Sequence, residues 1–170
     1  MVTMLELLDS AVKIGLGAAI SGVATYCVTK RNQTHEIKMN ILGYKKELLK
    51  DCAYKLDQSV SLMNESKDSV RRQLDGVQDE THWILTDEQS VNMVEAFNRA
   101  KESRTLAFII NEQELVGLLT DYVAVLEKEQ KYFKSKTLKM SLVNECSGER
   151  KRIKNSIMIK IGDAFASMSI

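Results

Sequence analysis

The sequence predicts an all-α fold: an N-terminal transmembrane helix, followed by a long helix and a three- to four-helix antiparallel bundle. The chain contains no proline, its apolar residues recur at helical spacing, and an apolar run stands near the N-terminus. Proline marks turns and edge strands, so its absence favours helices joined by short polar links. With 44% hydrophobic and 28% charged residues among 170, the chain has enough of both for one folded domain with a core. We place a membrane anchor at residues 1–31 and a cytosolic helical bundle at residues 32–170.

The first element is an apolar run at residues 11–28, in which Lys13 is the only charge. A helix of this length spans about 27 Å, close to the hydrocarbon core of a bilayer, which is about 30 Å thick. Acidic residues precede the run and Lys30 and Arg31 follow it, whereas a signal peptide has its basic residues first. Because positive charges stay on the cytosolic side, the run predicts a single-pass protein of the inner (plasma) membrane, with its N-terminus outside and its C-terminal domain cytoplasmic.

Small residues share part of this run at helical spacing, which lets another helix approach closely. We call this set the small-residue ridge; its members are Gly15, Ala18, Ala19 and Gly22. The ridge predicts a helix-packing contact, including contact between copies of the chain in a homo-oligomer. The alternative is a soluble protein whose glycine-rich first helix packs internally against its own core.

After the anchor, apolar residues at steps of three and four predict a long helix. They are Ile37, Ile41, Tyr44, Leu48, Cys52, Leu56, Val60, Met63, Val70 and Leu74. We expect Gly76 to end this helix. The helix either continues unbroken or breaks once near residues 57–61.

Three shorter helices are expected to follow. Thr86 with Gln89 forms a capping box that starts the first of them, and residues 106–110 are expected to continue that helix rather than form a strand. The second starts at residues 111–114 and the third near Ser147. The expected inward-facing residues are, in turn, Val91, Val94, Phe97 and Ala100; Leu115, Leu118, Leu119, Tyr122, Leu126 and Phe133; and Ile153, Ile157, Ile161, Phe165 and Met168.

The motifs of known chemistry predict no catalytic residue, cofactor or metal site. Asp79 and His82 have the spacing found in di-iron bundles, but one such motif lacks the further carboxylates that those sites need; a polar linker is the simpler interpretation. The sequence contains no nucleophile elbow and no glycine-rich phosphate loop. Three cysteines without metal-ligand spacing (Cys27, Cys52 and Cys146) predict reduced, buried thiols. We therefore expect a protein that is not an enzyme.

The last helix carries the densest basic run, which we expect to face solvent. Its members are Arg150, Lys151, Arg152 and Lys154. On an amphipathic helix such a run is typical of contact with an anionic surface, either lipid or nucleic acid. A solvated face of the bundle is the alternative. The net charge of +1 excludes the overall positive field of a dedicated polyanion binder.

Taken together, these features predict a membrane-anchored helical interaction protein, a scaffold or effector with an unknown protein partner. The bilayer is its second partner, through residues 11–28. A membrane-tethered nucleic-acid-binding module is the alternative, and a soluble helical regulator or enzyme is the further one.

Overall fold

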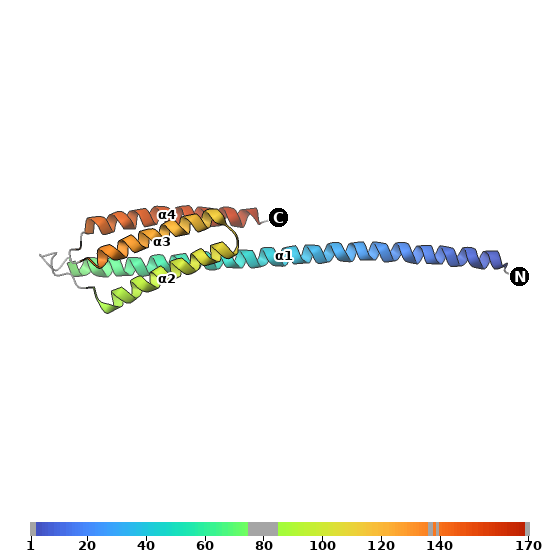
Figure 1. Ribbon diagram of the computed structural model, residues 1–170, viewed down its shortest axis with the longest axis horizontal. Coiled ribbons are helices and arrows are strands. Elements are labelled where there is room, and N and C mark those ends of the chain that lie inside the picture. Colours follow the sequence, from blue (N-terminus) through green and yellow to red (C-terminus); the bar gives the residue numbers. More distant parts are fainter. Residues whose placement is uncertain (1–2, 75–84, 136–137, 139, 169–170) are drawn as a thin grey trace. The chain divides into compact units, whose positions relative to one another are not determined.

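The computed structural model describes residues 3–74, 85–135, 138 and 140–168, and within these residues every regular element is a helix (Figure 1). The four helices are α1 (Met4–Leu74), α2 (Asp87–Ile109), α3 (Gln113–Phe133) and α4 (Met140–Ser167). The all-α prediction is confirmed. The expected stop at Gly76 lies outside the described residues.

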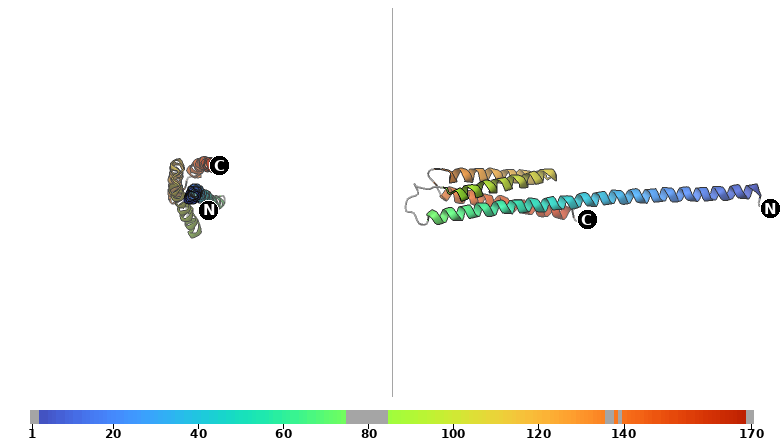
Figure 2. Two further views of the ribbon diagram at one scale, coloured as in Figure 1. Left: turned by 90° about the vertical axis from the view of Figure 1, so that its right-hand side faces the viewer. Right: turned by 90° about the horizontal axis from the view of Figure 1, so that it is seen from below.

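The chain divides into two compact units, Met1–Tyr44 and Lys45–Ile170, and α1 contributes to both. The second unit is a bundle of four helices: α1 from Lys45 onward together with α2, α3 and α4 (Figure 2). A boundary between anchor and domain at residue 31 stays a prediction.

Side-chain contacts show that neighbouring helices of the bundle run antiparallel. Positions that ascend along one helix meet positions that descend along the next, as expected for an up-down-up-down bundle. The pairs are Ser69 with Gln89 and Cys52 with Ser103 between α1 and α2, Met93 with Gln130 between α2 and α3, Glu129 with Arg150 and Glu114 with Lys160 between α3 and α4, and Asn64 with Arg150 and Asp57 with Lys154 between α1 and α4. Each helix therefore has two neighbours, and the core lies between all four.

The bundle part of α1 buries a regular stripe and runs without a break. Its fully buried residues are Leu49, Cys52, Leu56, Ser59, Met63, Ser66 and Val70. The predicted stripe is therefore confirmed from Cys52 to Val70, with Val60 half-buried, although Ile37, Ile41 and Tyr44 are exposed. The alternative of a break near residues 57–61 is wrong, because α1 is continuous there.

The predicted capping box at the start of α2 is confirmed. Thr86 Oγ1 accepts a hydrogen bond from the Gln89 amide at 3.2 Å, and the Thr86 amide donates to Gln89 Oε1 at 3.0 Å. These two bonds satisfy backbone and side-chain groups that the first helical turn leaves without partners. The helix continues to Ile109, so the expectation of a helix rather than a strand at residues 106–110 is also confirmed.

The predicted inner face of α2 is largely wrong. Val91 and Val94 are 64% and 48% exposed, and only Ala100 of the four predicted residues is fully buried. The inward-facing side chains are Gln89, Met93, Ala96, Ala100, Ser103 and Ala107. Most are small, so α2 packs close to its neighbours through little side-chain volume, and the larger valines remain outside.

A Schellman motif at Asn111 ends α2 and leads into α3. Asn111 has a φ of 62°, its amide donates to the Phe108 carbonyl at 3.0 Å, and the Glu112 amide donates to the Ala107 carbonyl at 3.1 Å. Asparagine tolerates this left-handed conformation better than most residues, which suits it to the position. The sharp turn lets α3 start at Gln113 and return along α2.

The predicted apolar stripe of α3 is confirmed, since five of its six residues are buried and Leu118 is half-buried. Helix α4 begins at Met140, earlier than the predicted start near Ser147. Its Ile157, Ile161 and Met168 are buried as expected, while Ile153 and Phe165 are half-buried.

Candidate functional site

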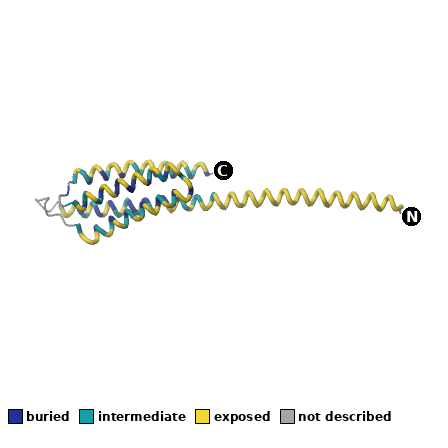
Figure 3. Tube along the Cα trace, in the orientation of Figure 1, coloured by how far each residue is buried: buried dark blue, intermediate teal, exposed yellow. Residues whose placement is uncertain are grey.

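The N-terminal part of α1 is long and apolar enough to span a membrane. An 18-residue window within it has a mean hydropathy of 1.5, and none of that window is buried (Figure 3). A side chain at Gly15, Gly17 or Gly22 would meet no atom within 4 Å. All four residues of the small-residue ridge are exposed, and both the contact through this ridge and the alternative of internal packing stay predictions.

A buried ion pair joins α3 to α4 in the centre of the bundle. The Arg150 Nε donates to Glu129 Oε2 at 3.0 Å, and the two side chains are only 3% and 0% exposed. A second Arg150 nitrogen, Nη2, donates to Asn64 Oδ1 on α1, also at 3.0 Å. One guanidinium thus connects three helices.

The prediction that Arg150 faces solvent is wrong. Arg150 lies four residues after Cys146 and seven before Ile157, and both of these are buried. The helical period therefore places it in the apolar stripe of α4, a signal that was present in the sequence. The prediction of an exposed side chain followed the charge of Arg150 rather than its position, because arginine is rarely buried unless it is paired.

Burial shifts the pKa values of two groups at this ion pair. It raises the pKa of the Glu129 carboxyl, and the positive charges of Arg150 and Lys67 oppose the shift. It also raises the pKa of the Tyr122 hydroxyl, against the effects of nearby Arg150 and Ser59. Glu129 Oε1 is buried without a hydrogen-bond partner among the described residues. This polar cluster therefore places two groups with raised pKa values between α1, α3 and α4.

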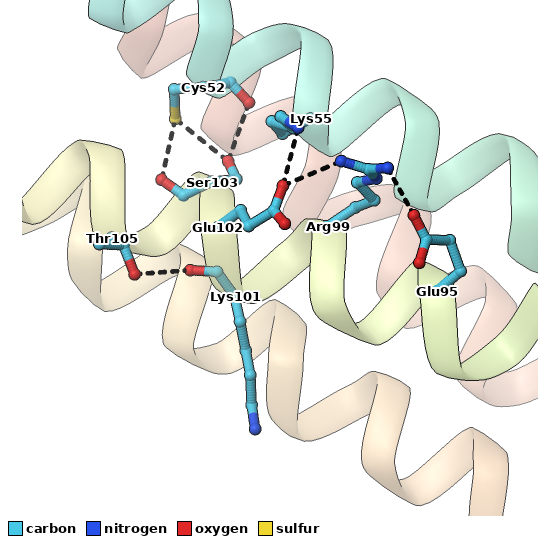
Figure 4. A network of polar contacts seen from close by, with 8 residues as sticks. All are labelled: Cys52, Lys55, Glu95, Arg99, Lys101, Glu102, Ser103 and Thr105. Atoms are coloured by element: carbon cyan, nitrogen blue, oxygen red, sulfur yellow. Dashed lines mark hydrogen bonds and ion pairs between the residues drawn. The ribbon is translucent and has the colours of Figure 1, made fainter.

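A second polar network lies in a groove of about 670 Å³ between α1 and α2 (Figure 4). Glu102 is its centre and accepts from Lys55 at 2.8 Å and from Arg99 at 3.1 Å. Arg99 also contacts Glu95 at 2.5 Å. The hydrogen bond from Lys55 is the main reason why the pKa of Glu102 is lowered. Such part-exposed pairs add little stability each, and of the three only the Lys55–Glu102 pair joins α1 to α2.

The Cys52 thiol lies beneath this network and contacts Ser103. Its Sγ is 3.1 Å from Ser103 Oγ, and the Ser103 hydroxyl donates to the Cys52 carbonyl at 2.9 Å. Burial raises the pKa of the Cys52 thiol, which disfavours the reactive thiolate. Cys146 is also buried, whereas Cys27 is exposed. The prediction of buried thiols is therefore confirmed for two cysteines and wrong for Cys27.

Two other members of the basic run, Lys151 and Lys154, lie at a smaller groove between α1 and α4. Lys151 and Arg152 are exposed, and Lys154 contacts Asp57 at 2.7 Å. Lys151 and Lys154 line the groove, which has a volume of about 300 Å³, together with Asn64 and the edge of Arg150. Contact between these residues and an anionic surface stays a prediction.

Among the described residues, no three His, Cys, Asp or Glu side chains group in a way that would hold a metal ion. Asp79 and His82 lie outside the described residues. No protein-family model, curated protein or solved structure matches this chain.

Proposed function

We propose that this is a membrane-anchored helical interaction protein: α1 crosses the inner membrane, and the bundle binds a partner protein in the cytoplasm. The observation that supports this most is the contrast along α1. Residues 11–28 form an apolar helical segment that is exposed throughout. From Leu49 onward, the same helix buries side chains in the core of the bundle.

The free energy of hydration favours a bilayer around the exposed segment. Ile14, Ile20 and Val23 are 64–73% exposed, and removing a large aliphatic side chain from water contributes about 1.5–3 kcal/mol. A row of such residues is costly in water and is stabilised by lipid. Lys13 lies near one end of the run and forms an ion pair with Asp9 at 2.6 Å, which suits the headgroup region.

The polar groups of the bundle favour binding over chemistry. Four charged residues in the α1/α2 groove, Lys55, Glu95, Arg99 and Glu102, pair with one another. The two buried cysteines are poor nucleophiles because burial raises the pKa of their thiols. A rigid four-helix body with a charged surface is suited to present one face to another protein. In this proposal the anchor holds the protein at the membrane, and the bundle provides the surface that binds the partner protein.

Membrane fractionation of the full-length protein tests the anchor. We expect the protein to pellet with membranes and to resist carbonate extraction. Ile20→Lys places a charge in the middle of the span, at a cost of about 2.5–3.5 kcal/mol, and should release part of the protein. Ile159→Lys is a matched control at an exposed bundle position and should leave the protein in the pellet. Full-length protein that stays soluble without detergent contradicts the proposal.

The exposed Lys151 and Arg152 support an accessory contact with an anionic leaflet. Each basic residue near such a surface contributes about 1 kcal/mol, and salt screens the attraction. Lys151→Gln with Arg152→Gln should therefore weaken binding to anionic vesicles at low salt more than at high salt. Stronger binding to DNA than to vesicles, with a steep salt dependence, would favour the nucleic-acid alternative instead.

A further inference from the structure

The first unit has apolar residues on several sides of α1, and one series of mostly apolar positions continues along a single face. These positions alternate at steps of four and three, interrupted only where Lys30 and Thr34 occupy two positions of the same series. We call this face the seam; its apolar members are Leu16, Ile20, Val23, Cys27, Ile37, Ile41 and Tyr44. A repeat of seven residues with two apolar positions is the pattern of a two-helix coiled coil, whereas a lone straight helix drifts away from it.

The side chains of the seam are exposed. Its six large apolar side chains are 53–64% exposed, and Cys27 is exposed as well (Figure 3). In residues 32–44, away from the seam, most positions are polar, such as Gln33, Glu36 and Asn40, with Met39 and Leu42 as exceptions. Burying an exposed apolar stripe of this kind against another surface is favourable. The seam is therefore suited to a helical partner.

The course of the seam identifies the kind of partner. It keeps its seven-residue spacing from the apolar run at residues 11–28 into the more polar residues 32–44. Lipid would cover only the first part, and a soluble protein only the second. A helix that follows the same course through membrane and water covers both, and a second copy of this chain carries the matching seam. Two copies held by the same anchor are parallel and at equal depth, so each seam residue meets its own counterpart.

We infer that the protein forms a parallel homodimer through the α1 seam. This inference rests on the proposed membrane anchor. It also names a face different from most of the small-residue ridge: at 100° per residue, Gly15, Ala18 and Gly22 are centred about 130° around the helix from Leu16, Ile20 and Val23, and Ala19 lies between the two sets. The seam and the ridge are thus alternative contacts between the same two helices.

The two polar seam positions are compatible with this contact. The Thr34 hydroxyl donates to the Lys30 carbonyl of its own helix at 2.9 Å, so it needs no partner across the dimer. The Lys30 ammonium lies 6.0 Å from the centre of the Tyr26 ring, which directs it along the flank of the helix. Polar residues at single core positions of a coiled coil fix register and copy number at some cost in stability.

Cys27 makes the dimer directly testable, because it lies on the seam and is the one exposed cysteine of three. Full-length protein in isolated membranes is oxidised with copper phenanthroline and separated on a non-reducing gel. We expect a disulfide-linked dimer as the main product, since facing core positions bring the two thiols within bonding reach. The matched control is Cys27→Ser with Thr25→Cys, which moves the thiol to the side of the ridge and should remain monomeric.

Two further variants test whether the seam continues beyond the apolar run. Ile41→Asn should reduce cross-linking through Cys27 severalfold, whereas Met39→Asn, off the seam, should leave it unchanged. Cross-linking at Thr25→Cys but not at Cys27 assigns the contact to the ridge and overturns the inference. Equal cross-linking at both positions, none at either, or no effect of Ile41→Asn also overturns it. Pelleting of the same samples separates the proposals: a failed anchor leaves protein in the supernatant, and a failed seam leaves pelleted monomer.

Discussion

The Arg150–Glu129 pair is the residue-scale feature that most distinguishes the bundle core. Two opposite charges lie almost fully out of water, 3.0 Å apart, and Asn64 accepts a second hydrogen bond from the same guanidinium. Desolvation of such a pair offsets much of its attraction, so the pair adds little net stability compared with apolar residues. Removing one member of the pair should lower the free energy of unfolding, because the other member is then left buried and unpaired.

Arg150→Gln should therefore destabilise the bundle by about 3–5 kcal/mol, the cost typical of breaking a buried pair. The neighbouring Lys151→Gln, at an exposed position, should change stability by no more than about 0.5 kcal/mol. Urea unfolding of the full-length protein in mild detergent, followed by circular dichroism, measures both. Replacing the pair together, with Glu129→Leu and Arg150→Met, should recover most of the loss. Equal effects of the two single glutamine variants would contradict the burial of Arg150.

The raised pKa of Glu129 predicts a pH dependence with a definite sign. Burial raises this pKa above its ordinary value of 4.5, so the folded state holds the proton more tightly than the unfolded state. The stability that this proton contributes is fully present below pH 4.5 and is lost as pH rises through the folded-state pKa. Urea unfolding between pH 4.5 and neutrality should show the free energy of unfolding falling more, or rising less, in the wild type than in Glu129→Gln. Parallel pH profiles would contradict it.

At the scale of elements, the position of a side chain on α2 decides whether it is buried, more than its hydrophobicity does. Its inward face consists mostly of alanine, serine and one methionine, while Val91 and Val94 point outward. Small residues let the backbones of α1, α2 and α3 come close. Polar contacts also join these helices, such as the hydrogen bond of 3.0 Å from Gln89 Nε2 to Ser69 Oγ. A helix with so little apolar volume depends on close packing for its stability.

Two adjacent residues of α2 provide a test of this face. Met93 is 1% exposed, so Met93→Ala should cost about 2–5 kcal/mol through lost burial and a cavity. Val94 is 48% exposed, and Val94→Ala should change stability by about 0.5 kcal/mol or less. Thermal or urea unfolding of the two variants compares them directly. A larger loss at Val94 would restore the inner face predicted from the sequence.

At the scale of the whole molecule, the chain combines an exposed apolar helix with a bundle that has its own core. Every fully buried residue among those described lies within residues 49–168. The first unit, Met1–Tyr44, contributes none of them. The folding of the bundle should therefore be independent of the anchor.

Shortened chains test this independence. A chain that begins at Asn32 should be soluble and helical, and one that begins at Lys45 should have the same free energy of unfolding at low protein concentration. Both keep the entire buried set, so neither loses core packing. Urea titrations of the two proteins make the comparison. A Lys45 chain that is much less stable would show that residues 32–44 belong to the folded domain.

The sequence by itself determined the features that depend on local spacing. The absence of proline, the capping box at Thr86 and the apolar period of α3 indicate helices because each signal acts within one or two turns. The same local reasoning identifies the apolar run at residues 11–28. The early start of α4 at Met140 and the Schellman turn at Asn111 have weaker local signals, and the sequence analysis missed them.

Only the tertiary structure decided which faces of the helices are buried and which charges meet. Val91 and Val94 are as apolar as many core residues, but the neighbours of α2 lie on its other side. Arg150 and Glu129 are separated by 21 residues, and each alone resembles a surface residue. Their burial depends on the antiparallel alignment of α3 and α4, which brings the two charges together. Burial is a property of what surrounds a side chain, and those surroundings come from residues distant in the sequence.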